Sequence, residues 1–369
     1  PEADYAYIQV EASLQAVKDI AEFYLEQLQI PVVGITGSVG KTSTKEVIAS
    51  VLKEKYRTLK TQGNFNNELG LPLTVFRLRD EDQIAVLEMG ISDFGEMARL
   101  TKIAKPDTCV ITNIGTCHLE NLGDRDGVLK AKTEIFQSMK PNGHIVLNGD
   151  DDKLITVREY NGVKPVFFGL NSERDVYADQ IESKGLKGVA CRIHLGEDAF
   201  DVLVPTPGIH MVYNALAAIS VGYLMGVKPA KMQQALAMFR NAGMRQEIIK
   251  RDGYTVIADC YNAGPESMEA ALADGACGVS LGLGYAPEIF YSTDGLIRAL
   301  APLHRSGVPI CVHMRQEGDG VVDALREMLE VARALQTPLE VSHLKAIGGR
   351  NARKAVPEML SLIEKARED

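Results

Sequence analysis

The stretch GITGSVGKTST, residues 34–44, lies between a short apolar run and a segment with helical periodicity. The apolar run predicts a buried strand, and the segment after it carries one apolar stripe, which consists of Val47, Ile48, Val51 and Leu52. A glycine-rich turn between a strand and a helix is typical of phosphate-binding loops, because backbone N–H groups and the positive end of the helix dipole point at the same anion. The stretch therefore predicts an α/β fold with a nucleotide-binding loop.

The residue types in this loop suit a bound nucleotide. Glycine lets the backbone approach phosphate oxygens, Lys41 can reach the outer phosphates, and the Thr42 hydroxyl can ligate Mg²⁺. The spacing departs from the common phosphate-loop pattern, because Ile35 stands where that pattern has its first glycine. A glycine-rich turn without a ligand is the alternative. We expect ATP to contact six residues of the loop, namely Gly37, Ser38, Gly40, Lys41, Thr42 and Ser43.

Length, charge and cysteine content limit the classes of protein to be considered. The chain has 369 residues, which suggests two or three domains, and its net charge of −9 argues against a general nucleic-acid-binding surface. No apolar run approaches the roughly 20 residues of a membrane span. The six cysteines contain no CxxC pair and are expected to be reduced thiols. We therefore expect a cytoplasmic monomer with no nucleic-acid partner and no membrane span.

Apolar runs that end in polar residues or glycine predict parallel strands with functional loops at their carboxyl ends: PVVGITG, DQIAVLEMG, DTCVITNIG and GHIVLNGDD. Residues 176–204 predict a small antiparallel patch, and GYTVIADCYN predicts a further strand. After residue 274 the pattern changes to three strands, GVSLGLGY, VPICVHMR and PLEVSHLK, which are followed by helices over residues 293–305, 320–336 and 354–367. Three consecutive βα units predict a second, parallel sheet.

The motifs that follow the loop resemble, in their order along the chain, those of the Mur ligases of peptidoglycan synthesis, and most of all the MurF type. These motifs are NFNNELGLPLT, VLEMGISDFGEM, ITNIGTCHLENLG, AKTEIF, LNGDD, GIHMVYNALAA and MRQEII…DCYNAGPESM. The loop itself is similar to the TGxxGKT variant of that family. The resemblance covers residues 5–272, and it departs from the family at Gly264, where the family usually has asparagine.

The resemblance implies an ATP-dependent amide ligase. In this reaction ATP phosphorylates a substrate carboxylate, and an amine then displaces phosphate from the acyl phosphate through a tetrahedral intermediate. The MurF type joins D-alanyl-D-alanine to UDP-N-acetylmuramoyl-tripeptide, so these two molecules are the implied substrates. The resemblance also implies that residues 29–271 are a central ATP-binding domain with a mainly parallel sheet, and that residues 1–28 are a linker helix left from a preceding UDP-binding domain.

Metal ligands are implied at three motif positions besides Thr42. Glu88 of VLEMG matches an acidic Mg²⁺ ligand, and His118 of TNIGTCHLE matches a ligand of a second metal. Lys132 of AKTEIF matches the lysine that the family carries as a carbamate, which is an anionic oxygen ligand. The residues alone leave alternatives open, namely a solvated glutamate, a structural histidine and an ordinary surface lysine, with Lys130 on a neighbouring helical position.

Three further residues match family positions near the nucleotide. Arg245 would offset developing phosphate charge, Asp259 would accept hydrogen bonds from ribose hydroxyls, and Asn214 would lie beside them. Capping is the alternative for Asn214 and Asp259. Asn113 either orients the loop or belongs to a plain turn, and His210 matches the family but could be a structural histidine at a helix start. The implied catalytic set is Lys41, His118, Lys132 and Arg245.

The tail beyond residue 272 has a different resemblance. The segments ADGACGVSLGLGYAPEIFYST, VHMRQEGDG and VSHLKA are similar to N-acyl-D-amino-acid deacylases, which are amidohydrolases with a TIM barrel, and His313 and His343 match their metal ligands at strand ends. The chain has no HxH pair, and two imidazoles alone make a poor hydrolytic zinc site, so zinc is not expected. A structural or solvent-facing role is the alternative for both histidines.

These resemblances predict a chimera that is joined near SMEAALADGA. Residues 272–369 would be a (βα)₃ fragment of an amidohydrolase barrel, in the place of the ligase family's own carboxyl-terminal domain. Three functions compete on this basis. The first is a MurF-type ligase slowed by missing domains, the second is an ATP-binding remnant without turnover, and the third is a zinc-dependent N-acyl-D-amino-acid deacylase.

Overall fold

The chain forms two compact units, residues 1–184 with 188–240 and residues 185–187 with 241–369. The predicted domain boundary after residue 271 stays a prediction. None of the described helices is long and apolar enough to cross a membrane. The computed structural model describes residues 9–240, 247–251, 254–258, 268, 272, 275–284, 291–342, 344–347 and 352–367.

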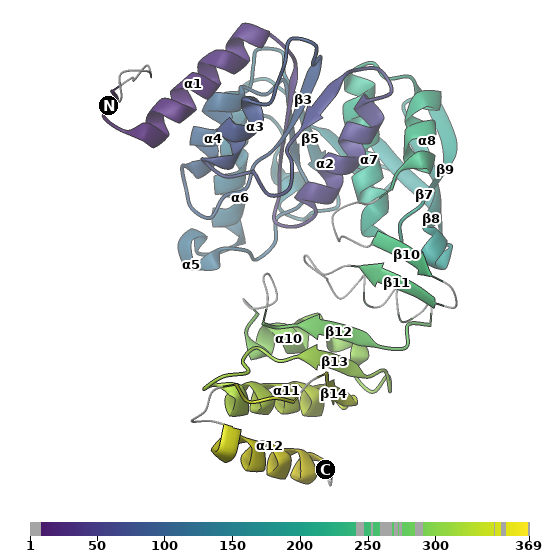
Figure 1. The fold of residues 1–369 in the computed structure, drawn as a ribbon. Helices are drawn as coiled ribbons and strands as arrows, with labels where there is room; N and C mark the ends of the chain where they lie inside the picture. Colours follow the sequence, from purple (N-terminus) through teal and green to yellow (C-terminus); the bar gives the residue numbers. More distant parts are fainter. Residues whose placement is uncertain are drawn as a thin grey trace. The chain divides into compact units, whose positions relative to one another are not determined.

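A sheet forms the centre of the first unit (Figure 1). It has nine strands in the order β2-β3-β1-β4-β5-β6-β7-β8-β9. The strands from β2 to β7 pair in parallel, and β8 and β9 continue the sheet antiparallel. The predicted antiparallel patch is therefore an extension of the main sheet and not a separate one. The strands are β1 (Val32–Thr36), β2 (Thr58–Lys60), β3 (Ile84–Glu88), β4 (Thr108–Ile111), β5 (His144–Asn148), β6 (Val166–Gly169), β7 (Val176–Ser183), β8 (Val189–Leu195) and β9 (Asp198–Val204).

Helices cover both faces of this sheet, and alternate strand residues belong to two separate hydrophobic cores. Val33 and Ile35 pack in the core that contains α2, α7 and α8, whereas Val32 packs in the core that contains α1, α3, α4 and α6. Burial on both faces explains why the strands read as nearly continuous apolar runs. The helices are α1 (Ser13–Leu28), α2 (Lys41–Leu52), α3 (Gly70–Val75), α4 (Glu96–Ala104), α5 (Leu119–Leu122), α6 (Arg125–Thr133), η1 (Glu134–Phe136), η2 (Leu154–Thr156), α7 (His210–Leu224) and α8 (Pro229–Met238).

The strand order places the ends of β1, β3 and β4 next to one another. β1 pairs with β3 on one side and with β4 on the other, although β2 and β3 follow it in the chain. The order therefore reverses at β1, and ligands of open parallel sheets bind outside the carboxyl ends of the strands at such a reversal. The loop of residues 37–40 follows β1 at this point.

The second unit contains a two-stranded antiparallel sheet and a three-stranded parallel sheet. The parallel order β12-β13-β14 and the helices between these strands agree with the three predicted βα units. The predicted first helix, residues 293–305, is shorter because Pro302 cannot continue a regular helix, and α10 ends at Ala299. The elements are η3 (Gly185–Lys187), β10 (Glu247–Arg251), β11 (Tyr254–Ala258), β12 (Val279–Gly282), α10 (Thr293–Ala299), η5 (Ala301–Leu303), β13 (Ile310–His313), α11 (Val321–Leu335), β14 (Leu339–Val341) and α12 (Ala352–Ala366).

Candidate functional site

Two glycines shape the loop between β1 and α2. A Cβ atom added to Gly37 would lie 1.9 Å from Thr112 Oγ1, so no larger residue fits there without movement of Thr112, which follows β4. Gly40 precedes α2 with a φ of 80°, in the left-handed region that glycine adopts readily. Gly37 is needed because there is no room for a Cβ atom, and Gly40 is needed because of its left-handed backbone. Neither reason depends on a bound ligand.

The residues after β4 hold the loop in place. The N–H of Ser38 donates to the carbonyl of Asn113 at 3.0 Å, and the N–H of Val39 donates to Asn113 Oδ1 at 2.8 Å. Thr112 Oγ1 donates to the carbonyl of Val39 at 2.7 Å, and the N–H of Gly115 donates to Ser38 Oγ at 2.8 Å. The loop conformation is thus fixed by the neighbouring strand, and the N–H groups of Ser38 and Val39 are already used.

The first turn of α2 supplies the remaining N–H groups. The first N–H groups of any α-helix have no partner within the helix, so those at the start of α2 can meet an anion. Lys41 lies over the loop, where its ammonium donates to the carbonyls of Gly37 at 2.9 Å and Ser38 at 3.3 Å. Thr44 Oγ1 donates to Asn214 Oδ1 at 2.8 Å, and Asn214 is 7% exposed in the middle of α7. Asn214 is therefore not a helix cap, and it ties α7 to the loop helix.

Glu88, the last residue of β3, lies beside Thr42. Its side chain is 2% exposed, which excludes the alternative of a solvated glutamate. Thr42 Oγ1 donates to Glu88 Oε1 at 3.1 Å, and Asn66 Nδ2 donates to the same oxygen at 2.8 Å. The N–H of Glu88 donates to Thr61 Oγ1 at 2.9 Å. A hydroxyl and a carboxylate at the end of a phosphate-binding loop are the hard oxygen ligands that Mg²⁺ prefers.

The Glu88 carboxylate and the Thr42 hydroxyl suit a divalent cation whose remaining ligands come from a bound molecule or from water. Glu88 Oε2 is buried and accepts no hydrogen bond from the described residues. In the part of the chain that the structure describes, no three His, Cys, Asp or Glu side chains are grouped closely enough to hold a metal ion. A cation here would therefore take Glu88 and the Thr42 hydroxyl and complete its shell with phosphate oxygens, water or a modified lysine.

Lys132 is buried, whereas its neighbour Lys130 is exposed. Lys132 is 2% exposed on the inner side of α6, which excludes the alternative of an ordinary surface lysine. Burial, together with the nearby positive charge of Lys41, lowers the pKa of Lys132 to about 8, against a smaller opposite effect of Cys117. A lysine with this pKa is partly neutral near physiological pH, and the neutral amine is the form that reacts with CO₂.

The other predicted residues lie in different surroundings. His118 is exposed at the N-terminus of α5 with a φ of 56°, on the segment that follows β4. His210 is half-buried at the first position of α7. Arg245 and Asp259 were predicted to contact the nucleotide and His343 to be a less favoured metal ligand, and their side chains lie outside the described residues. The structure therefore brings Lys41, Thr42, Glu88 and Asn214 together at one edge.

His313 lies at the end of β13 in the second unit. Its Nδ1 is 3.7 Å from Glu317 Oε1, and Lys345 Nζ is 2.9 Å from Glu317 Oε2. The Lys345 side chain is 51% exposed, so this is a partly solvated group of charges. The surroundings of His313 supply a carboxylate and an ammonium.

Two residues that lie beside Glu88, Asn66 and Lys45, were not predicted from the sequence. Asn66 donates to Glu88 Oε1, and the Lys45 ammonium lies 3.5 Å from Glu88 Oε2. Asn66 lies in the quoted motif NFNNELG, where no role was assigned to it, and Lys45 lies one helical turn after Lys41 and Thr42. The helical spacing of three and four residues was the signal that could have identified Lys45, because residues at this spacing share one face of a helix. A buried lysine is rare enough that the apolar pattern gave no reason to expect it.

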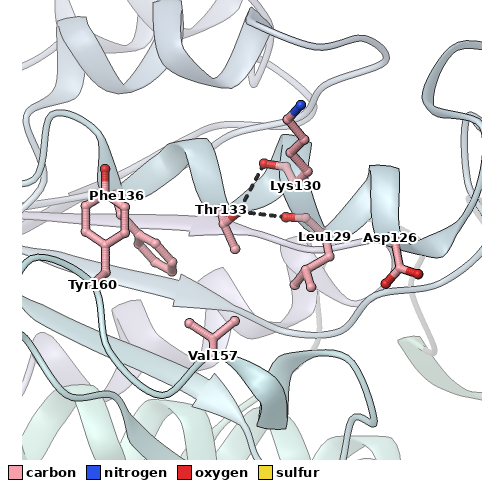
Figure 2. Close-up of a pocket in the computed structure, with 7 residues that line it drawn as sticks. All are labelled: Asp126, Leu129, Lys130, Thr133, Phe136, Val157 and Tyr160. Atoms are coloured by element: carbon pink, nitrogen blue, oxygen red, sulfur yellow. Dashed lines mark hydrogen bonds between the residues drawn. The ribbon is translucent and has the colours of Figure 1, made fainter.

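A surface hollow of about 370 Å³ lies away from the loop, against α6 (Figure 2). The rings of Phe136 and Tyr160 meet there at 5.3 Å between centroids, and Thr133 Oγ1 donates back to the carbonyls of Leu129 and Lys130. The hollow contains none of the loop residues and is not the candidate site. Its lining residues are Asp126, Leu129, Lys130, Thr133, Phe136, Val157 and Tyr160.

Sequence comparison identifies a known domain and named relatives. The sequence profile described as the Mur ligase middle domain matches residues 35–222. The chain is 41% identical over 273 residues to the UDP-N-acetylmuramoyl-tripeptide–D-alanyl-D-alanine ligase of Bacillus subtilis (strain 168), with 74% of this chain and 58% of the relative covered. It is 32% identical over 259 residues to the enzyme of the same name from Escherichia coli (strain K12), with 70% and 57% covered. The chain thus spans less than two thirds of the length of either relative.

Solved structures match over a larger part of the chain. The ligase from Acinetobacter baumannii that adds D-alanyl-D-alanine according to its name superposes with a TM-score of 0.78 at 27% identity, with 99% of this chain and 77% of that chain covered. The MurF ligase from Thermotoga maritima in complex with ADP superposes with a TM-score of 0.71 at 25% identity, with 100% and 87% covered.

Proposed function

The chain belongs to the Mur ligase family, and from this premise we propose that it takes part in the ATP-dependent ligation for which its relatives are named. The reaction would join D-alanyl-D-alanine to UDP-N-acetylmuramoyl-tripeptide in peptidoglycan synthesis. The observation that carries the proposal is the contact between Thr42 and Glu88 at the end of a loop that β4 holds rigid. A cytoplasmic location and a monomeric state are part of the same proposal.

The loop edge would bind ATP through its triphosphate. The N–H groups at the start of α2 would contact phosphate oxygens, and Lys41 would exchange its two carbonyl partners for the outer phosphates. Thr42 and Glu88 would hold Mg²⁺, which neutralises phosphate charge as the tripeptide carboxylate approaches. Asn214 would support the loop from α7.

The ligation would then proceed in two steps, a phosphoryl transfer followed by an acyl transfer. The tripeptide carboxylate oxygen attacks the γ-phosphorus and ADP leaves, which gives the acyl phosphate. The free amine of D-alanyl-D-alanine attacks the acyl carbon, loses a proton, and inorganic phosphate leaves as the amide forms. As the family resemblance implies, Arg245 is proposed to offset developing phosphate charge, His118 to be a ligand of a second metal ion, and Asp259 to bind the ribose.

Lys132 is proposed to carry a carbamate that completes the metal site. Its burial supports this role, because a neutral amine adds CO₂ and the resulting anion offers oxygen ligands where the described residues have too few. With a pKa of about 8, roughly a quarter of the Lys132 amine is neutral at pH 7.5, against roughly one part in a thousand for an ordinary lysine. The environment thus favours the neutral amine, which is the form that reacts with CO₂, before any ligand binds.

The resemblance of the tail to deacylases supports a second, separate proposal. His313 lies at the carboxyl end of a strand in a parallel sheet whose strands follow the chain order, as in a TIM barrel. We propose on this ground that residues 272–369 derive from an amidohydrolase barrel, without a working zinc site. The alternative is that these residues are a carboxyl-terminal domain of the ligase family. The match to solved ligase structures over nearly the whole of this chain supports that alternative.

One assay tests the main proposal. The purified chain is supplied with Mg-ATP and UDP-N-acetylmuramoyl-tripeptide, and phosphate release and the mass of the ligated product are measured with and without D-alanyl-D-alanine. We expect dipeptide-dependent phosphate release that Lys41→Ala lowers at limiting ATP. ATP binding without dipeptide-dependent release would support the ATP-binding remnant instead. Absence of ATP binding would contradict both.

A further inference from the structure

Lys45 is a buried cation on the face of α2 that carries Thr42. Its side chain is 0% exposed, and its ammonium lies 3.5 Å from Glu88 Oε2 and 3.4 Å from Glu46 Oε1. Neither Lys45 Nζ nor Glu88 Oε2 forms a hydrogen bond with another described residue. The contact between them is therefore one of charge, and it leaves the lone pairs of Glu88 Oε2 unused.

The two oxygens of Glu88 are held in different ways. Oε1 accepts hydrogen bonds from Thr42 and Asn66, at 3.1 and 2.8 Å. Oε2 lies 3.5 Å from the Lys45 ammonium and accepts no hydrogen bond from the described residues. The hydrogen bonds to Oε1 fix the direction of the carboxylate, and the charge of Lys45 offsets its negative charge in a place that water does not reach.

The charges around Glu88 balance without a metal ion. Glu46 pairs with Lys60 as well as with Lys45, so Lys45, Glu46, Lys60 and Glu88 form one cluster, here called the Glu88 charge cluster. Two lysines and two glutamates give a net charge of zero. Lys60 is 33% exposed and contacts Glu46, whereas Lys45 contacts both glutamates and is fully buried. Lys45 is thus the cation that balances Glu88.

We propose that Lys45 is the internal counter-ion of Glu88, a positioning residue that takes the place of a divalent cation until the nucleotide arrives. Its ammonium lies beside the oxygen of Glu88 that Thr42 and Asn66 leave without a hydrogen bond. Its positive charge also repels a second cation, so the site accepts a metal ion together with the anionic phosphates and not alone. This inference rests on the proposed nucleotide and metal site.

Binding of Mn²⁺ tests the proposal without any measurement of activity. The free Mn²⁺ signal in electron paramagnetic resonance gives the metal affinity of the unaltered chain, Lys45→Met, Lys45→Arg and Lys60→Met, with and without a non-hydrolysable ATP analogue. Without nucleotide, we expect Lys45→Met to bind Mn²⁺ at least about tenfold more tightly than the unaltered chain, because a buried carboxylate has lost its counter-ion. Lys45→Arg keeps the charge and Lys60→Met keeps the Glu88 contact, so both should stay within about threefold of the unaltered chain.

Thermal unfolding provides a second readout if Lys45→Met folds poorly. Mn²⁺ alone should raise the melting temperature of Lys45→Met, and of the more polar Lys45→Gln, by more than it raises that of the unaltered chain, since the ion replaces the missing ammonium. Equal Mn²⁺ affinity and equal stabilisation in all variants would overturn the inference. Failure of the unaltered chain to bind Mn²⁺ even with the ATP analogue would overturn the proposed function as well, which separates the two outcomes.

Discussion

The carboxyl edges of the two parallel sheets carry similar residue types in very different surroundings. At the end of β3, the Glu88 side chain is 2% exposed and is contacted by two hydrogen-bond donors and a buried lysine. At the end of β13, the His313 side chain is 20% exposed and stands 3.7 Å from Glu317, which a half-exposed lysine also contacts. Burial of charge costs free energy that only compensation offsets, and this cost is greater at Glu88, whose lysine partner is fully buried, than at Glu317, whose lysine partner is half-exposed.

The comparison teaches that a strand-end position does not by itself make a site. Both edges have the geometry from which parallel sheets build sites. At the first edge, Asn113 and Thr112, which follow the neighbouring strand β4, hold the loop after β1. At the second edge, the N–H of Ile347 donates to the carbonyl of Glu317 at 2.6 Å. Chemistry at the second edge would need further ligands, and the described residues do not supply a group of three.

Replacement of Lys132 should have the largest effect at the first edge. We expect Lys132→Ala to lower metal-dependent phosphate release by about 100-fold, since an anionic ligand is lost. Added acetate or formate should restore part of the activity by occupying the space of the carbamate. Lys130→Ala is the matched control, because Lys130 is exposed on the same helix, and it should stay within about twofold. Equal losses in both variants would contradict the assignment.

Replacement of one glycine in each unit by alanine should lower the unfolding free energy in the first unit and leave it nearly unchanged in the second. Gly37→Ala places a Cβ 1.9 Å from Thr112 Oγ1 and should cost about 1–3 kcal/mol of unfolding free energy, together with most of the ATP affinity. At Gly278 the nearest atom is 3.9 Å away and the backbone is not left-handed, so Gly278→Ala should change stability by less than about 0.5 kcal/mol. Denaturant unfolding and calorimetry with ATP measure both effects. Equal behaviour of the two variants would show that the loop adjusts freely.

Removal of one lysine at each edge should lower ATP affinity at the first edge and leave it unchanged at the second. Lys41→Ala loses a charge-assisted contact with phosphate worth about 1.5–3 kcal/mol, which is roughly 10–100-fold in ATP affinity. Lys345→Ala removes a lysine from the edge near β13 and should leave ATP affinity unchanged. Isothermal titration calorimetry gives both values. An ATP affinity that is the same in Lys41→Ala and the unaltered chain would exclude the loop as the phosphate site.

The pKa of Lys132 predicts how its carbamylation rate depends on pH. Burial disfavours the ammonium form and lowers the pKa to about 8, and only the neutral amine reacts with CO₂. At fixed dissolved CO₂, the initial rate should therefore rise by about tenfold from pH 7 to pH 9 and level off above pH 8, whereas ordinary lysines should gain about 100-fold over the same range without levelling. Carbon-13 NMR with labelled CO₂ measures the rate. A steady rise without levelling would mean that Lys132 titrates like a surface lysine.

Much of the first unit could be predicted because its signals are local. The apolar runs predicted β1, β3, β4 and β5, and the glycine pattern predicted the loop, since each depends on neighbouring residues alone. The place of β7 in the main sheet could not be predicted, because pairing between β6 and β7 depends on contacts that no single segment encodes. The short α10 could have been predicted from Pro302.

The candidate site was predictable where a motif marks it and not where packing makes it. Thr42 and Glu88 stand in recognisable motifs, and the structure places them 3.1 Å apart. The contact of Lys45 with Glu88 joins α2 to β3 across the core, and a hydropathy pattern assigns a lysine to the surface. Whether Lys132 or Lys130 is the inner residue of α6 likewise depended on which side of the helix packs against the sheet.

The smallest effect is expected at the second edge, where His313→Ala should change almost nothing. The imidazole is partly exposed, so its loss should alter the unfolding free energy by less than about 1 kcal/mol. ATP affinity should be unchanged, and neither the unaltered chain nor the variant should hydrolyse N-acetyl-D-amino acids in the presence of zinc, because a hydrolytic zinc site normally has at least three protein ligands. The measurement is amine release from N-acetyl-D-methionine with added zinc, together with the ATP titration. Zinc-dependent hydrolysis that His313→Ala abolishes would mean that a strand-end histidine beside one glutamate and one half-exposed lysine suffices for a site, and the contrast between the two edges would no longer hold.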